Sequence, residues 1–254
     1  MAKSVQNIKN LLNDFVIQVS SGLVISAIIV IASNIWLGVV AFSLFIVAIV
    51  VYLLSGKYRR LYKLIKAGGR GYYNSFDQED NYKVFEESNQ TFCYMGISAN
   101  SIIELFRKWI ASNPTVKSYS FLLMNPDSHN LRRQKAFERG IDLNADLSEL
   151  DRSLHLAINE DVEAEKKRIT SAIAVLKTLQ PFKEGKLTIR FYEEFPPWWM
   201  YIIDDQKVFV GILEKGKRGQ NSPVMEISKV HEFSSLYNTF RNIWEIMWLN
   251  AKEV

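Results

Sequence analysis

Residues 15–32 read FVIQVSSGLVISAIIVIA, and residues 35–54 read IWLGVVAFSLFIVAIVVYLL. Neither stretch contains Asp, Glu, Lys or Arg, and only Ser33 and Asn34 separate them. A helix of about 20 apolar residues crosses the ~30 Å core of a bilayer, so each stretch is long enough to span it. The polar pair between the two stretches indicates a turn. Residues 15–54 therefore predict a transmembrane hairpin of two helices, since lipid leaves no other partner for the backbone polar groups.

A signal peptide and a buried hairpin of a soluble core are the alternatives. The apolar part of a signal peptide has only ~7–15 residues, and here a second apolar stretch follows the first directly. Lys3 and Lys9 precede the hairpin and six Lys or Arg residues follow it within 57–70, whereas its turn carries no charge. The excess of positive charge on both flanks predicts that both termini are cytoplasmic.

Composition divides the chain into four regions. Residues 1–70 hold eight basic residues and one acidic residue, whereas the remainder holds 23 basic and 26 acidic residues. The basic excess therefore belongs beside the membrane, where it attracts anionic lipid, and gives little support for DNA binding. We expect an amphipathic helix at 1–14, the hairpin at 15–54, a basic juxtamembrane stem at 55–70 and a cytoplasmic domain at 71–254.

Gln18, Gly22 and Ser26 recur every four residues on one face of the first span. Small residues at this spacing allow two helices to approach closely, and polar ones bond across helices or face water in a pore. Packing and pore lining both remain open. Two helices cannot enclose a channel, so a pore requires an oligomer.

Strand and helix patterns alternate through the cytoplasmic domain, which predicts an α/β sandwich. Residues 72–90 are polar and acidic, which predicts a loop with short extended pieces. The expected strands are 91–97, 119–124, 187–192, 199–203, 207–213 and 224–228, and the expected helices are 101–111, 131–138, 147–179 and 233–249. Ligands of such sheets sit at the carboxyl ends of the strands, which predicts that Ser98, Asn100, Asn125 and Asp127 meet at one crevice.

Cys93 is the single cysteine and the three histidines show no metal-binding spacing, so we expect neither a disulfide nor a metal or other cofactor.

Residues 197–211 read PWWMYIIDDQKVFVG and resemble the phospholipase D family over a strand, an Asp-Asp turn and a returning strand. The family signature is His-x-Lys-x4-Asp followed by Gly-Ser-x-Asn. Pro197 stands at the His position and Trp199 at the Lys position, and only Asp204 of the triad remains. The resemblance implies a phospholipase D-like fold over most of residues 91–249 that is not an enzyme, because proline cannot act as the nucleophile. Asp204 is then expected to shape the turn rather than to act in catalysis.

Residues 215–223 read KGKRGQNSP and supply cations, glycines and amide donors that suit phosphate groups. Tryptophan faces stack nucleic-acid bases at ~1–3 kcal/mol per base. A solvated surface turn and packing at an oligomer interface are the alternatives for the loop and for the tryptophan pair. The candidate nucleotide-binding residues are Ser98, Asn100, Asn125, Arg190, Trp198, Trp199, Lys215, Lys217, Arg218 and Ser222.

A two-span hairpin joined to a degenerate phospholipase D-like domain is similar in layout to the Hailong-type membrane effectors of bacterial anti-phage defence. The resemblance implies a homo-oligomer in the bacterial inner membrane, and the expected oligomer is a tetramer. It also implies an ion channel or pore gated by a nucleotide or short oligonucleotide, and a partner nucleotidyltransferase that makes this ligand. The alternatives are a membrane-tethered phosphodiesterase or lipid hydrolase with a non-standard active site, and a passive scaffold.

Overall fold

The computed structural model describes residues 19, 43–48, 50–51, 61–112, 118–142, 144–148, 150–230 and 235–254. The chain forms two compact units, Met1–Tyr62 and Lys63–Val254. In the first unit, residues 43–48 are helical and expose Leu44 and Phe45. The helix predicted at 1–14, most of the hairpin, and Gln18, Gly22 and Ser26 lie outside the described residues. Among the helices that are described, none combines the length and the apolar character needed to cross a bilayer.

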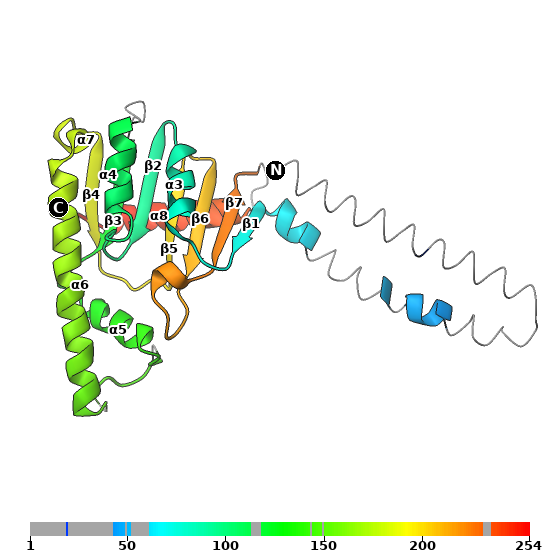
Figure 1. The fold of residues 1–254 in the computed structure, drawn as a ribbon, viewed down its shortest axis with the longest axis horizontal. Coiled ribbons are helices and arrows are strands. Elements are labelled where there is room, and N and C mark those ends of the chain that lie inside the picture. The colour runs from blue at the N-terminus through cyan, green and yellow to red at the C-terminus, as the bar shows by residue number, and fades with distance from the viewer. Residues whose placement is uncertain are drawn as a thin grey trace, which may run out of the picture. The chain divides into compact units, whose positions relative to one another are not determined.

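The second unit, here the α/β unit, is built on one sheet of eight strands in the order β1-β7-β6-β5-β2-β3-β4-β8 (Figure 1). Strands β2, β3 and β4 run parallel, and every other pairing is antiparallel. The strands are β1 Gly69–Tyr73, β2 Thr91–Gly96, β3 Ser118–Met124, β4 Leu187–Tyr192, β5 Trp198–Ile203, β6 Lys207–Ile212, β7 Val224–Ser228 and β8 Lys252–Glu253.

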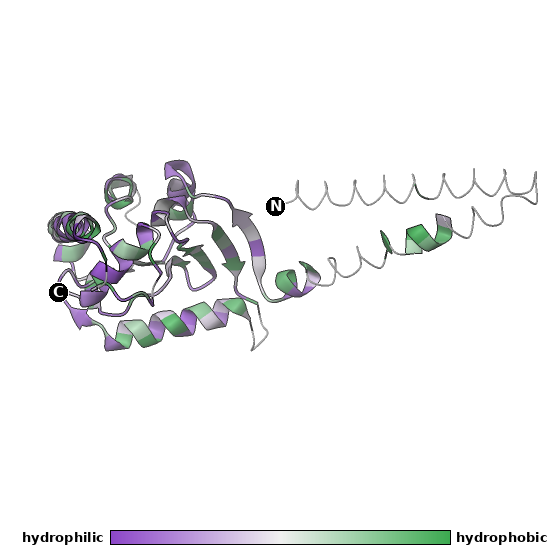
Figure 2. Cartoon of the chain, turned by 90° about the horizontal axis from the view of Figure 1, so that it is seen from below, coloured by the Kyte–Doolittle hydropathy of each residue, from purple (hydrophilic) through white to green (hydrophobic). Residues whose placement is uncertain are grey.

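Helices cover both faces of this sheet, as expected of an α/β sandwich. Helix α8 runs alone along one face with alternating apolar and polar residues, and α3, α4 and α6 lie on the other face (Figures 1 and 2). Helix α5 packs beside the N-terminal part of α6, beyond the edge of the sheet (Figure 1). The helices are α3 Gln78–Glu86, α4 Ile103–Ser112, α5 His129–Glu138, α6 Arg152–Thr178, α7 Gln180–Lys183 and α8 Leu236–Asn250.

The loop predicted at residues 72–90 is wrong where α3 forms, whereas the end of β1 is one of the short extended pieces expected there. Asp77 caps α3, and its side chain accepts a hydrogen bond of 2.9 Å from the Asp80 backbone N–H. The Asp80 carboxylate accepts one from the Asp77 backbone N–H in return, which completes a capping box. The side chains of Val84 and Phe85 are buried on the inner side of the helix. The acidic composition that indicated a loop belongs to the cap and the solvent side of a short amphipathic helix.

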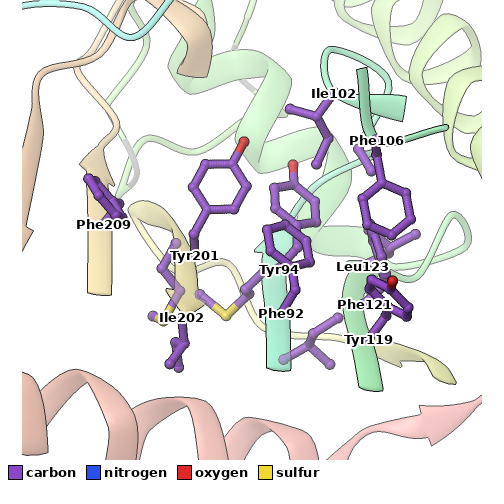
Figure 3. Close-up of a cluster of buried hydrophobic side chains, with 14 of the residues drawn as sticks. Phe92, Tyr94, Ile102, Phe106, Tyr119, Phe121, Leu123, Tyr201, Ile202 and Phe209 are labelled. Carbon is purple, nitrogen blue, oxygen red and sulfur yellow. The ribbon is translucent and has the colours of Figure 1, made fainter. Parts of the chain in front are cut away.

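The aromatic part of the core of the α/β unit lies between the sheet and helices α3 and α4 (Figure 3). Phe92 and Phe106 are fully buried with ring centroids 5.5 Å apart, and Phe106 meets Phe121 edge to face at 4.9 Å. Each buried aromatic ring removes a large apolar area from water, so this cluster fixes α4 on the sheet. The position of α4 in turn fixes the loop from β2 to α4, which borders the site below.

Candidate functional site at the carboxyl edge of the sheet

A pocket of about 540 Å³ opens where β2 ends and β5 begins. The two edges coincide because β5 runs antiparallel to β2, with Met95 opposite Met200. The sheet side of the pocket comes from the loop after β2, the start of β5 and the loop after β6, and the opposite wall comes from α5 and α6. The pocket therefore lies at the carboxyl ends of the parallel strands, the edge that the topology predicts for a ligand.

Five of the predicted nucleotide-binding residues line this pocket. They are Ser98, Asn100, Trp198, Trp199 and Arg218. They come from three separate segments of sequence, which the sheet order brings to one edge. The binding role of these residues stays a prediction, but their meeting is a feature of the fold.

The other predicted residues lie elsewhere. The Asn125 amide donates to the Glu193 carboxylate at 2.6 Å, and Asp127 lies 3.9 Å from Lys166, so neither side chain joins the pocket lining. Arg190 lies over the Trp248 ring and donates to the Trp248 carbonyl at 2.9 Å. Ser222 is fully buried outside the lining.

Lys215 and Lys217 belong to a loop that is tied to the helical wall rather than free to wrap a ligand. Lys215 pairs with Asp142 at 2.7 Å, and Lys217 pairs with Glu214. The Gly216 N–H donates to the Phe137 carbonyl at 3.0 Å, which attaches the loop to the end of α5. The loop after β6 is thus hydrogen-bonded to the end of α5 beside the pocket.

Trp199 has a structural role that its sequence position does not reveal. Its indole N–H donates to the Gly219 carbonyl at 3.0 Å. A Cβ atom on Gly211 would lie only 2.1 Å from the Trp199 ring, so the absence of a side chain at Gly211 makes room for the indole. The ring therefore holds the loop after β6 against β5, at the position where the phospholipase D signature has its lysine.

Asp204, at the Asp position of that sequence pattern, directly follows β5 and lies about 17 Å from Trp199 along the strand at ~3.3 Å per residue. Its carboxylate accepts hydrogen bonds from the backbone N–H groups of Asn89, Gln90 and Thr91 at 2.7–3.2 Å. Asp204 and Asp205 both have φ of 51°, which forms the tight turn into β6. Asp204 thus contributes to the predicted turn, and its side chain also anchors the segment that enters β2.

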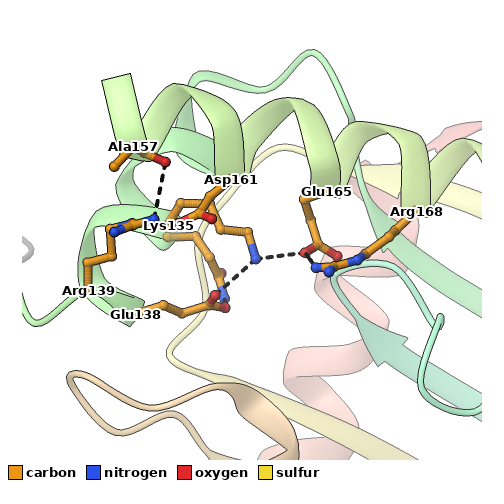
Figure 4. Close-up of polar contacts among 8 residues, drawn as sticks. Lys135, Glu138, Arg139, Ala157, Asp161, Glu165 and Arg168 are labelled. Carbon is orange, nitrogen blue, oxygen red and sulfur yellow. Dashed lines mark hydrogen bonds and ion pairs between the residues drawn. The ribbon is translucent and has the colours of Figure 1, made fainter. Parts of the chain in front are cut away.

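Six charged residues that no sequence pattern indicated as a site lie on the helical wall of the pocket: Lys135, Glu138, Arg139, Asp161, Glu165 and Arg168. Four of them contact one another in a chain (Figure 4). Lys135 on α5 lies 3.0 Å from Glu138 and 2.8 Å from Glu165 on α6, and Arg168 lies 3.0 Å from Glu165. We call Lys135, Glu138, Glu165 and Arg168 the charged cluster. The side chains of Lys135 and Glu165 are each 6% exposed, so their pairing takes place away from water.

Glu165 is ionised in this setting. Burial by itself raises the pKa of its carboxyl group, but the charge of Lys135 and hydrogen bonds from Lys135, Ser98 and Arg168 outweigh burial and lower the pKa. Glu165 is therefore an anion held by surrounding donors, and it balances cations that a ligand would otherwise meet.

The lining is close to neutral. Lys135 and Arg168 are paired within the charged cluster, and Arg139 pairs with Asp161 at 2.5 Å. Arg218 is exposed, and no carboxylate pairs with it among the residues that the structure describes. The pocket thus offers one uncompensated cation beside aromatic rings and amide groups.

Buried phenols also border the pocket. Burial raises the pKa values of Tyr94, Tyr192 and Tyr201 above the ordinary value for tyrosine. None of these hydroxyls is a ready nucleophile at neutral pH, because the phenolate is disfavoured away from water. Over the described part of the chain, no group of three or more His, Cys, Asp or Glu side chains is arranged to hold a metal ion.

The sequence did not mark the charged cluster as a site. Lys135 and Glu138, like Glu165 and Arg168, are spaced three apart on charged helices, a pattern typical of exposed helical pairs. Only the packing of α5 against α6 reveals that Lys135 and Glu165 are buried.

No protein-family model matches the sequence, and no curated protein matches it. Among solved structures, the chain is similar to TrmBL2, an archaeal chromatin protein whose structure shows a novel mode of DNA binding. That alignment has a TM-score of 0.42 and 15% identity, and covers 87% of this chain and 72% of that one. The chain is also similar to Nuc from Salmonella typhimurium, a phospholipase D family member, with a TM-score of 0.38, 12% identity, and coverage of 72% of this chain and 95% of that one.

A third similar structure is phosphatidylserine synthase from Haemophilus influenzae Rd KW20, with a TM-score of 0.45 and 7% identity. The alignment covers 72% of this chain and 39% of that one, so the chain spans less than half the length of the synthase. The α/β unit agrees with the expected α/β sandwich at the level of a mixed sheet covered by helices on both faces (Figure 1).

Proposed function

We propose that the α/β unit is a phospholipase D-like domain that has lost catalysis and serves as a receptor for a nucleotide or short oligonucleotide. The full proposal is a homo-oligomeric membrane effector of anti-phage defence, in which this receptor gates a channel or pore built by the hairpin at 15–54. A partner nucleotidyltransferase would supply the ligand. The observation that carries the proposal is that Trp199, at the lysine position of the family signature, lines the pocket, while Pro197 stands at the histidine position of the same signature.

The loss of chemistry follows from these substitutions. Phosphodiester cleavage in the family begins with attack by an imidazole, and proline offers no nucleophilic atom. Trp199 directs its N–H to Gly219 and brings no charge to a phosphate oxygen. Asp204 binds three backbone amides at the far end of β5, so it is remote from the pocket.

The remaining groups suit a nucleotide. Trp198 and Trp199 supply aromatic surface, and Ser98 and Asn100 supply hydrogen-bond donors and acceptors. Arg218 supplies a guanidinium group that can bind a phosphate through two parallel hydrogen bonds. A volume of about 540 Å³ lies within the ~300–1,000 Å³ typical of small-molecule sites.

Coupling to the membrane requires that the ligand prefer one arrangement of the spans. A ligand shifts such an equilibrium only by its difference in affinity for the two states. The stem at 55–70 joins the hairpin to the α/β unit and is the covalent route for this coupling.

The test is a flux assay on the purified full chain in liposomes, with a panel of nucleotides and short oligonucleotides. We expect ion flux under one ligand condition and not another, and binding of the same ligand measured by calorimetry. Arg218→Ala should weaken this binding about tenfold or more, as expected for a charged hydrogen bond worth ~1.5–3 kcal/mol.

Lys186→Ala is the matched control, because it also removes one exposed positive charge. Lys186 lies far in sequence from the pocket loops and forms an ion pair with nearby Glu184. We expect it to leave binding unchanged. Equal flux under all ligands by an intact oligomer would contradict gating. Turnover of a phospholipid or dinucleotide would contradict the loss of catalysis and favour a tethered hydrolase.

A further inference from the structure

We propose that Lys135 and Arg168 form an anion-binding subsite for one phosphate group of the ligand, and that the carboxylate of Glu165 occupies this subsite in the structure. The inference deepens the proposed function, on which it rests only in that the ligand carries a phosphate. It assigns a role to a side-chain cluster on α5 and α6 that the phospholipase D signature does not include.

The geometry is that of a built anion site. The Lys135 ammonium lies 2.8 Å from Glu165 Oε2, and the Arg168 guanidinium lies 3.0 Å from the same oxygen. Ser98 lines the same pocket. Two cations thus converge on one anionic group (Figure 4), and all three residues line the pocket. A phosphate oxygen needs the same donors at the same distances.

A purely structural reason for the cluster is weak. Removing two charges from water costs several kcal/mol per ion, and an apolar pair of similar volume is often as stable or more stable. Lys135 and Glu165 nevertheless form such a pair, and Arg168 adds a further cation on the pocket side with its side chain 44% exposed. An arrangement of this kind is useful where a second anion can take the place of the first.

Exchange is feasible because Lys135 has two carboxylate partners. Glu138 lies 3.0 Å from its ammonium group, so Lys135 stays paired while Glu165 gives way. A phosphate carries up to two negative charges, whereas Glu165 carries one, which favours the phosphate in contact with two cations. Glu138 and Asp161 remain on the pocket wall and repel further negative charge. The subsite is therefore suited to one phosphate group and not to a run of several.

The test measures binding of inorganic phosphate to the full chain in detergent, at constant ionic strength set with chloride. Glu165→Gln keeps the size of the side chain and removes its charge, which leaves Lys135 and Arg168 free to hold an external anion. We expect this variant to bind phosphate at least about tenfold more tightly than the wild-type protein, a change of ~1.4 kcal/mol. Phosphate affinity that is unchanged or weaker in Glu165→Gln would overturn the subsite.

Glu163→Gln is the matched control. Glu163 lies on the same helix, is exposed, and pairs with Lys166 at 3.4 Å. The variant makes the same change of net charge away from the charged cluster. We expect its phosphate affinity to equal that of the wild-type protein, and a gain as large as that of Glu165→Gln would assign the effect to net charge and overturn the subsite.

A second variant covers the case in which Glu165→Gln fails to fold. Replacing Lys135 and Glu165 together by methionine removes the subsite and both charges of the buried pair, while Glu138 keeps its hydrogen bond from Gln134. Phosphate should raise the melting temperature of the wild-type protein and have no effect on the double variant. An equal rise in both proteins would overturn the subsite.

The outcome separates the subsite from the proposed function. If the wild-type protein binds a nucleotide while Glu165→Gln gains no phosphate affinity, the subsite is wrong and the receptor function stands. If Glu165→Gln binds phosphate while the wild-type protein binds no nucleotide or oligonucleotide of the panel, the subsite stands and the receptor function is wrong.

Discussion

Two buried regions of the α/β unit, one beside α4 and one between α5 and α6, contain different kinds of side chain. Between the sheet and α4, fully buried rings such as Phe92, Phe106 and Trp109 pack in a core without charged side chains. Between α5 and α6, Lys135 and Glu165 are almost as deeply buried, yet they form an ion pair. Burial is similar in the two regions, but its chemistry differs.

The difference teaches where a ligand can act. Apolar packing is non-directional and scales with the area removed from water, so a polar solute has no group to exchange with it. An ion pair is a specific contact between two partners, and another anion can compete for the cation. The region around α4 therefore fixes the shape of the α/β unit, and the region around α5 is the one where a charged ligand can change contacts.

The largest expected effect is in the aromatic core. Phe106→Ala should lower the free energy of unfolding by about 4 kcal/mol, because it removes a fully buried ring and leaves a cavity among close neighbours. Urea unfolding of the α/β unit within the full chain measures the change. Leu249→Ala is the control, since Leu249 is 77% exposed and its loss should change stability by less than ~0.5 kcal/mol. Similar losses in the two variants would break the comparison.

The next effect is in the charged cluster. Lys135→Met should cost about 3 kcal/mol, because it leaves the Glu165 charge buried with one cation fewer. Replacing both Lys135 and Glu165 by methionine should restore most of this stability. A double variant as unstable as the single one would show that the pair is required for folding itself, and the distinction between a fixed core and an exchangeable cluster would then fail.

Asp204 offers a third kind of contact to compare, a carboxylate that accepts hydrogen bonds from backbone amides outside the charged cluster. Asp204→Ala should lower stability by about 2 kcal/mol, because three backbone amides lose a charged acceptor. Ligand affinity, measured by calorimetry on the same protein, should not change. A variant of full stability that lost ligand binding would instead assign the retained aspartate to the site.

The smallest expected effect is electrostatic and concerns the partly exposed carboxylate of Asp205. Burial by itself raises the pKa of Asp205, but hydrogen bonds from Lys229, Tyr237 and Arg241 and the charge of Lys229 lower the pKa to about 2. The folded-state pKa is thus below the ordinary value of 3.8. The stabilisation is complete above that value and is lost as the pH falls from 3.8 towards 2.

Asp205→Asn removes this dependence, so the stability gap between it and the wild-type protein should close as the pH falls through that window. We expect a gap below about 1 kcal/mol, since the Asp205 side chain is half exposed and solvent screens its charge. Urea midpoints measured from pH 5 to pH 2 give the gap directly. A gap that is constant with pH would show that the hydrogen bonds, and not the charge, stabilise the turn.

The order and type of most elements followed from the sequence because their signals are local. The predicted strand at 187–192 coincides with β4, and the helix predicted at 147–179 contains α6, whose start is fixed by the Asp151 cap. Helix α3 was missed because its capping residues make the segment look polar. Strand β8 was missed because its two residues form a strand only by pairing with β4.

The candidate site divides in the same way. Ser98, Asn100, Trp198, Trp199 and Arg218 were predicted from loop chemistry at strand ends, and they do meet at one pocket. Arg190 was assigned to the same site, but it lies in the middle of β4 and faces α8 through Trp248. Arginine is a cation that can bind phosphate, which is why Arg190 was assigned to the site. Its position on β4, however, directs the side chain to one face of the sheet and decides what it contacts.

By itself, the sequence determined the order and type of most strands and helices in the α/β unit, and its two apolar stretches predict a hairpin. Each of these depends on residue identity or on spacing within one segment. Only the tertiary structure decided that Lys135 and Glu165 are a buried pair, that the indole of Trp199 lies over Gly211, and that Asp204 anchors the entry to β2. Burial and partner choice are set by contacts between segments far apart in the chain, and no local pattern of residues encodes them.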